Sequence, residues 1–179
     1  MSTLAAAEKL TRDRFREQYL DRKPYFELID GVPEQKALGS RKHALLQLIL
    51  GRMLDDLGLP IGAELTLEIS EVWEPIPDLA TITPGGGVYQ DSPPGVAIEI
   101  ISPTDRFTQV QKKVARYAEW GVKDILVFDP EERLVYRWDH SVKSLVLLSN
   151  EGCIRFESYP VSLVISEVFK RLDEKLKVG

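Results

Sequence analysis

Glu99 interrupts an otherwise apolar stretch, residues 96–101, whose sequence is VAIEII. A short apolar run of this kind is typical of a strand that is covered on both faces of a sheet. An unpaired carboxylate in such a place would cost several kcal/mol, so Glu99 must be protonated, paired with a cation or bound to a metal ion. An ion pair with Arg106 or Lys113 and metal coordination each meet this requirement.

Asp78 is a second acidic residue in a strand-like context. It follows Pro77 and precedes the apolar run LATI, which predicts a strand over residues 78–83. The glycines at 85–87 and the prolines at 93–94 would connect this strand to the one over 95–101. Pro-Asp is also a common turn signal. If the two strands are neighbours, Asp78 and Glu99 supply the oxygen ligands that Mg²⁺ prefers, with water filling its other positions.

Lys113 lies in a helix predicted over residues 106–120 and closed by Gly121. At about 100° per residue, Lys113 falls on the border of the apolar stripe, whereas Lys112 points to solvent. Lys113 can therefore lay its methylenes along the core edge and direct its ammonium toward the sheet. A lysine that only reaches past the core to water has the same pattern. The stripe consists of Phe107, Val110, Val114, Tyr117 and Ala118.

The rest of the chain predicts one α/β domain in which helices flank a mixed sheet. Strand 95–101, helix 106–120 and strand 124–128 follow in the order of a parallel crossover. Further helices are predicted over residues 11–20, from the N-cap Ser40 to Gly58, and over 166–177. Further strands are predicted over 25–29 with a turn at Asp30-Gly31 and a returning strand, over 62–70, and in a hairpin of 134–138 and 144–148.

Two of these elements carry a prediction about which side chains are buried. Segment 62–70 alternates apolar and polar residues, which predicts a half-buried strand with Glu64 and Glu68 facing water. The helix after Ser40 is predicted to bury one apolar face, made of Ala44, Leu45, Leu48, Ile49, Met53 and Leu57.

Composition limits the possible functions. The 179 residues fit a single domain over 1–179, with residues 1–10 as a flexible tail. The formal charge of −5 argues against wholesale electrostatic wrapping of nucleic acid, so any DNA contact must come from a local basic face. The single cysteine, Cys153, cannot form an intramolecular disulfide, and neither a secretory signal nor a bilayer-spanning stretch is found, which favours the cytoplasm.

Five blocks of the sequence, in order, resemble those of the Uma-two family, a restriction-endonuclease-like branch of the PD-(D/E)xK nuclease superfamily. The blocks are YFELIDG, KHALLQLILGRML, IPDLATI, GVAIEIISPTDR and KVARYAEWGVKDILVFDP, and they span residues 25–130. The resemblance implies an α/β fold with a restriction-endonuclease-like mixed β-sheet flanked by helices.

The resemblance also implies roles for individual residues. Asp78 matches the acid of the PD element and Glu99 the acid of the second half-motif, both as metal ligands. The usual lysine two positions after the second acid is absent because Ile101 stands there, and Lys113 matches a helical lysine that takes its role. Glu27, in YFELIDG, matches an acidic position that contributes a further ligand or orients water; an exposed strand carboxylate is the alternative.

His43, Gln109 and Arg106 are auxiliary candidates. His43 matches a histidine typical of the family, although its place in the first turn after Ser40 also fits a capped surface residue. Gln109 stands where many members have an acidic residue four positions before the helical lysine. The loss of that charge would weaken a second metal site or change how Lys113 is held. Arg106 is the alternative partner of Glu99.

Together these residues lead to the hypothesis of a metal-dependent endodeoxyribonuclease. Mg²⁺, or Mn²⁺ in its place, held by Asp78 and Glu99 would bind the scissile phosphate and lower the pKa of a water molecule. Lys113 would position that water, help to deprotonate it, or neutralise charge that develops on the phosphorus centre.

DNA is expected to bind weakly and with a strong salt dependence, because the basic face is small. It would consist of Lys112, Arg116, Arg106, Arg41 and Lys42. A homodimer is expected by analogy, since two sites can address two strands. Two other functions stay open. One is a non-catalytic interaction module with a nuclease fold, which the acidic balance and Gln109 favour; the other is a phosphodiesterase that acts on RNA or a small nucleotide.

Overall fold

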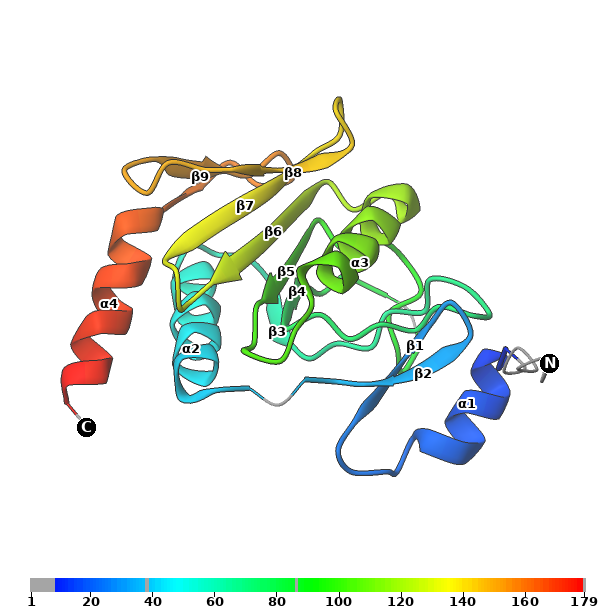
Figure 1. The fold of residues 1–179 in the computed structure, drawn as a ribbon. Coiled ribbons are helices and arrows are strands. Elements are labelled where there is room, and N and C mark those ends of the chain that lie inside the picture. The colour runs from blue at the N-terminus through cyan, green and yellow to red at the C-terminus, as the bar shows by residue number, and fades with distance from the viewer. Residues whose placement is uncertain (1–8, 38, 86, 179) are drawn as a thin grey trace.

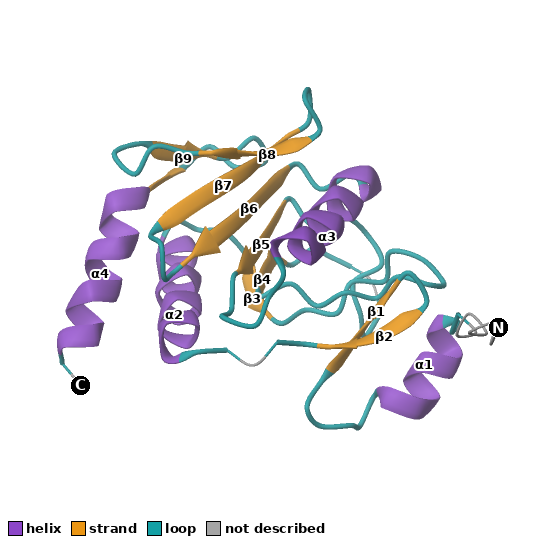
Figure 2. Cartoon of the chain, viewed as in Figure 1, coloured by secondary structure: helices purple, strands orange, loops and turns teal. Residues whose placement is uncertain are grey.

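The computed structural model describes residues 9–37, 39–85 and 87–178. The order of its helices and strands can be followed in Figure 1 and Figure 2. Most of the tail predicted over residues 1–10 lies outside the described residues, and the single-domain organisation stays a prediction. No helix in the described part of the chain is long and apolar enough to cross a membrane. The elements are α1 (Arg12–Tyr19), β1 (Phe26–Ile29), β2 (Val32–Gln35), α2 (Arg41–Asp56), β3 (Ile61–Ala63), β4 (Leu79–Thr81), β5 (Val96–Ile100), α3 (Phe107–Trp120), β6 (Asp124–Asp129), β7 (Leu134–Asp139), β8 (Ser144–Leu147), β9 (Cys153–Arg155), β10 (Ser162–Val164) and α4 (Ile165–Lys177).

The central sheet has six strands in the order β3-β4-β5-β6-β7-β8. Only β5 and β6 pair in parallel, and α3 connects them; the other pairs are antiparallel. The predicted parallel crossover and the mixed α/β fold are therefore confirmed. The C-terminal end of α3 is as expected, since the helix stops at Gly121, whose φ of 112° suits a residue without a Cβ.

The two faces of the sheet bury different side chains, because residues alternate along a strand. Val96, Ile98 and Ile100 of β5 pack in a core with residues of α2 and α4. Ala97 packs in a second core with Val110, Val114 and Tyr117 of α3. In Figure 1, α2 and α4 accordingly lie on one side of the sheet and α3 on the other. Glu99 shares the parity of Ala97 and therefore faces α3.

The predicted buried face of α2 is correct at Ile49 and Met53, which are buried. It is also correct at Leu45 and Leu57, which are partly buried against the same core, and it is wrong at Ala44 and Leu48. Leu46, Leu50 and Leu54 are the residues with no exposed surface. Ala44 is exposed and Leu48 is 50% exposed. Leucines occur around most of the circumference of this helix, so hydrophobic periodicity does not select one face. The burial of α2 depends on where the sheet and α4 lie.

The strand predicted over residues 62–70 is also mostly wrong. β3 ends at Ala63, and Glu64 has a φ of 53°, which turns the chain away from the sheet. Leu67 is buried in the core on the α3 side of the sheet. Its backbone forms only an isolated bridge to Gln90 and is not part of a regular strand. Glu68 does not simply face water, because its side chain pairs with Arg16 at 2.5 Å. The alternation therefore reflects burial of one side of an irregular segment.

An N-terminal layer of α1 and the hairpin β1-β2 packs beside the sheet (Figure 2). The hairpin turns at Asp30-Gly31, as predicted, and pairs Glu27 with Glu34. Backbone hydrogen bonds between Leu28 and Glu74 join it to the loop that leads to β4. This layer therefore brings residues of the hairpin to the start of β4.

Candidate active site

Asp78 and Glu99 lie on the same face of the sheet. In the β4–β5 register Leu79 is opposite Ile98 and Ala80 is opposite Ala97. The same register, continued by one residue, places Asp78 opposite Glu99, and opposed residues point to the same face. Both side chains line one small cavity of about 70 Å³.

Lys113 of α3 is the cation that pairs with Glu99. Its Nζ lies 3.0 Å from Glu99 Oε1 and 2.9 Å from Glu27 Oε1. The Tyr117 hydroxyl, one turn further along α3, donates to the same Glu99 oxygen at 2.6 Å. Glu27 Oε1 also accepts the backbone N–H of Ile76 at 2.6 Å. Glu27 is buried, so its alternative as an exposed strand carboxylate is wrong.

Burial and the paired charge have opposite effects on the pKa values of Glu99 and Lys113. Burial raises the pKa of Glu99, and the nearby Lys113 only partly opposes that rise. Burial disfavours the ammonium of Lys113, but Glu27 and Glu99 outweigh it and raise its pKa above the ordinary value. The pKa of Tyr117 is raised by burial and by the same carboxylates. Lys113 is thus held as an ammonium and Tyr117 as a neutral donor.

Asp78 has its own set of partners at the start of β4. Its Oδ2 accepts the backbone N–H of Ile100 at 2.7 Å. Its Oδ1 lies 2.9 Å from Lys36 Nζ and 3.4 Å from His43 Nε2. Burial by itself would raise the pKa of Asp78, but His43 and Lys36 outweigh it and hold that pKa well below the usual range. Asp78 is therefore an ionised carboxylate.

Lys36 is a cavity residue that the sequence did not single out. This lysine directly follows β2, and its Nζ also donates to the Ile76 carbonyl at 2.8 Å. Burial would lower the pKa of Lys36, but Asp78 raises it above the ordinary value. Strand parity contained a signal, because Lys36 lies two residues after Glu34, which is paired with Glu27. The alternation alone does not identify Lys36 as a site residue, because the sequence does not show that the hairpin packs against Asp78.

His43 is both capped and buried. Ser40 Oγ accepts the backbone N–H of His43 at 3.2 Å, as expected for an N-cap. The imidazole does not lie on the surface, since only 6% of His43 is exposed. Its Nδ1 lies 3.0 Å from Ser102 Oγ, and its Nε2 faces Asp78. The ring therefore joins α2 to the cavity.

The other auxiliary candidates lie further out. Gln109 is exposed but lines the mouth of the same cavity. Arg106 is exposed at the N-cap of α3 and is not among the residues that line the cavity. Lys113, and not Arg106, is therefore the partner of Glu99. Phe107, predicted in the buried stripe, is the first residue of α3. It is 39% exposed, and its ring contacts that of Tyr136 on β7.

The donor set of the cavity fits a hard divalent cation. Within residues 9–37, 39–85 and 87–178 there is no group of three or more His, Cys, Asp or Glu that could hold a metal ion by itself. Mg²⁺ needs only one or two protein carboxylates when water and substrate phosphates complete its shell. Asp78 and Glu99 meet that need, and carboxylates outnumber lysines in the lining. The charged lining residues are Glu27, Glu34, Asp78, Glu99, Asp105, Lys36 and Lys113.

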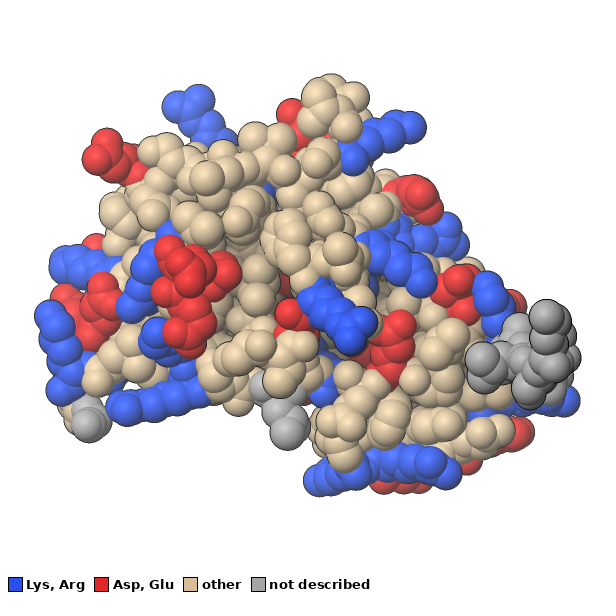
Figure 3. All heavy atoms as spheres, viewed as in Figure 1, with Lys and Arg blue, Asp and Glu red and all other residues tan. Residues whose placement is uncertain are grey.

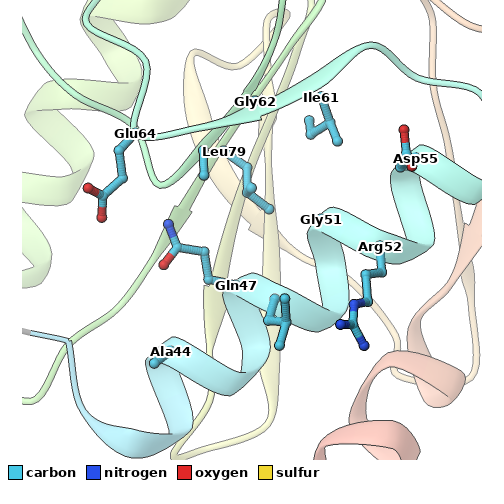
Figure 4. Close-up of a pocket in the computed structure, with 11 residues that line it drawn as sticks. Ala44, Gln47, Gly51, Arg52, Asp55, Ile61, Gly62, Glu64 and Leu79 are labelled. Carbon is cyan, nitrogen blue, oxygen red and sulfur yellow. The ribbon is translucent and has the colours of Figure 1, made fainter.

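A second, larger groove of about 670 Å³ lies between α2 and the edge strand β3 (Figure 4). Leu48 and Gly51 of α2 face Ile61 and Gly62 across it. The half-exposed Leu48 is thus a wall of this groove. The groove and the carboxylate cavity share no lining residue, although Gln47 of the groove donates to the backbone carbonyl of Asp78 at 2.9 Å.

The fold is similar to that of a crystal structure from Anabaena variabilis described as a "putative nuclease belonging to DUF820". The TM-score is 0.78 at 20% identity, and the match covers 91% of this chain and 99% of that chain. This likeness shows the fold, a mixed β-sheet flanked by helices. A family model, Uma2, described as "Putative restriction endonuclease", matches residues 12–152. The chain therefore belongs to the Uma2 family, as the ordered sequence blocks predicted. No curated protein matches it.

Proposed function

We propose that this protein is a metal-dependent endonuclease that hydrolyses DNA phosphodiester bonds. Mg²⁺, with Mn²⁺ as a substitute, would be held by Asp78 and Glu99. The observation that carries the proposal is the convergence of these two carboxylates, from adjacent strands, on a cavity that the Lys113 ammonium also reaches. The bound ion would supply charge neutralisation at the phosphate and a more acidic water.

Lys113 is better suited to neutralising charge than to accepting a proton. Glu27 and Glu99 raise its pKa against the effect of burial, so the amine has no free lone pair at neutral pH. An ammonium fixed by two carboxylates is a preorganised cation, which stabilises negative charge that develops on a phosphate. Glu27 holds the Lys113 ammonium in place. Its Oε1 accepts a hydrogen bond from Lys113 and another from the backbone N–H of Ile76, which fixes the position of the carboxylate. We therefore assign Glu27 a positioning role.

A small basic surface next to the cavity supports weak, salt-dependent DNA binding. Lys112 and Arg116 of α3 lie over the Trp73 ring, at 5.5 and 5.7 Å from its centroid. Lys42 is already paired with Glu131, and Arg116 itself also contacts Glu119. On the face shown in Figure 3, basic and acidic side chains are interspersed. Such a surface releases few counterions on binding.

Cleavage of DNA and RNA oligonucleotides with Mg²⁺ or Mn²⁺ tests the proposal. The wild type should cleave DNA only with a divalent ion, and Asp78→Asn should abolish cleavage and weaken Mn²⁺ binding in calorimetry. Lys170→Met, a charge change on α4 outside both the cavity and the predicted basic face, is the matched control. If the wild type binds neither ion, the nuclease assignment fails and the alternative of a non-catalytic interaction module is favoured. Cleavage of RNA or of small nucleotides alone would instead change the substrate class.

We further propose a homodimer in the cytoplasm. Two copies of the site would address two strands, and the lone Cys153 suits a reducing compartment. Light scattering coupled to size exclusion would give a dimer mass, and a monomer mass at micromolar concentration would exclude this part of the proposal.

A further inference from the structure

Asp78 has only one oxygen open to exchange of its partners. Its Oδ2 is bound to the backbone N–H of Ile100, which is part of β5 and cannot leave without breaking the sheet. The partners of Oδ1, Lys36 and His43, are side chains that can move, so we expect a cation that binds Asp78 to use Oδ1. Lys36 Nζ already lies 2.9 Å from Oδ1. The ammonium of Lys36 thus lies beside the oxygen at which we expect a metal ion to bind.

The two buried lysines of the cavity are held to different extents. Lys113 is fixed by two carboxylates, Glu27 and Glu99, and extends from the middle of α3. Lys36 has one carboxylate partner, Asp78, and one carbonyl partner, Ile76. It follows β2, on the segment that leads to α2, and not in a helix or strand. Of the two amines, Lys36 is therefore the one that can leave its carboxylate with the smaller loss of contacts.

A dication at Asp78 Oδ1 would lie within a few ångströms of the Lys36 ammonium. Repulsion between two cations at that separation is large in a buried site, where water screens little. The side chain of Lys36 is only 14% exposed, so it cannot remain in place and be screened. The flexible four-carbon chain of lysine gives the ammonium other positions nearby.

We propose that Lys36 is a built-in counter-ion of Asp78 that a divalent cation displaces, and that the displaced ammonium then contacts a phosphate oxygen of the bound nucleic acid. This inference rests on the proposed function, because it needs a metal ion at Asp78 and a polyanionic substrate. It makes Lys36 a substrate-binding residue that acts only when the metal site is filled.

Calorimetric titration of Mn²⁺ tests the first half. Lys36→Met removes the competing ammonium and keeps an unbranched apolar chain, so Mn²⁺ should bind about tenfold more tightly than to the wild type, or about 1.4 kcal/mol. Lys170→Met, the same substitution on α4 outside the cavity, should leave the affinity unchanged. Equal or weaker binding by Lys36→Met would overturn the inference.

Chemical labelling of lysines in the wild type gives a second readout that needs neither activity nor a variant. Acetylation followed by peptide mass spectrometry should show Lys36 reacting at least about fivefold faster with saturating Mn²⁺, because the ammonium has left a buried pair. Lys170, already 65% exposed, should react equally with and without Mn²⁺. Mn²⁺ binding with unchanged Lys36 labelling overturns this inference alone, whereas absence of Mn²⁺ binding overturns the proposed function as well.

The salt dependence of DNA affinity tests the second half. With Mn²⁺ present and an uncleavable phosphorothioate duplex, Lys36→Met should reduce the slope of log K against log salt by about one relative to the wild type. Without Mn²⁺ the two slopes should agree, because Lys36 is then bound to Asp78. Identical slopes in the presence of Mn²⁺ would rule out the phosphate contact.

Discussion

Replacement of Lys113 by methionine would remove the cation between Glu27 and Glu99 and keep an unbranched chain in the same space. All three side chains are at most 12% exposed, so solvent screens their interaction only slightly. Loss of one partner of such a buried pair costs about 3–5 kcal/mol, because the remaining charge has no compensation. Urea denaturation at pH 7 should therefore show Lys113→Met to be less stable than the wild type by about that amount.

The pH dependence of this loss distinguishes charge from packing. Burial raises the pKa of Glu99, and without Lys113 less opposes that rise. A carboxyl whose folded-state pKa is raised contributes stability below its unfolded pKa and loses it as pH rises through the folded value. The penalty of Lys113→Met should thus shrink toward pH 4. A loss below about 1 kcal/mol at pH 7, or one that is the same at pH 4 and pH 7, would refute the reasoning.

Three further predictions concern the cavity and the core. Tyr117→Phe removes the hydroxyl that donates to Glu99 at 2.6 Å, so thermal or urea unfolding should show a loss of about 1–3 kcal/mol, and an unchanged stability would contradict that bond. The depressed pKa of Asp78 contributes stability that is present above about pH 4 and is lost as pH falls through the folded value. Acid titration of Asp78→Asn, followed by circular dichroism, should therefore show a shallower loss than the wild type. Leu50→Ala in the core should lower the free energy of unfolding, measured by urea denaturation, by about 2–5 kcal/mol. Leu48→Ala, at a half-exposed position of the same helix, should lower it by less than about 1 kcal/mol. Equal losses would contradict the observed orientation of α2.

The local structure of this chain was largely readable from its sequence. The Ser40 cap, the turn at Asp30-Gly31 and the end of α3 at Gly121 each depend on a few adjacent residues, and the structure has all three. The apolar run around Glu99 predicted a strand covered on both faces, and β5 is buried at every position. Short-range patterns of this kind are decided by backbone geometry and by the period of burial.

The tertiary structure decided which distant residues meet. The sequence contained Glu27, Lys36, Asp78, Glu99 and Lys113 but did not show that the hairpin, two strands and α3 bring them to one cavity. It left Arg106 and Lys113 as equal partners for Glu99, and it did not single out Lys36. These contacts join residues up to 86 positions apart, and a single sequence carries no periodic signal for such pairs. Burial of ionisable groups then determines the pKa values and charge states on which the chemistry depends, because that burial exists only once the chain is folded.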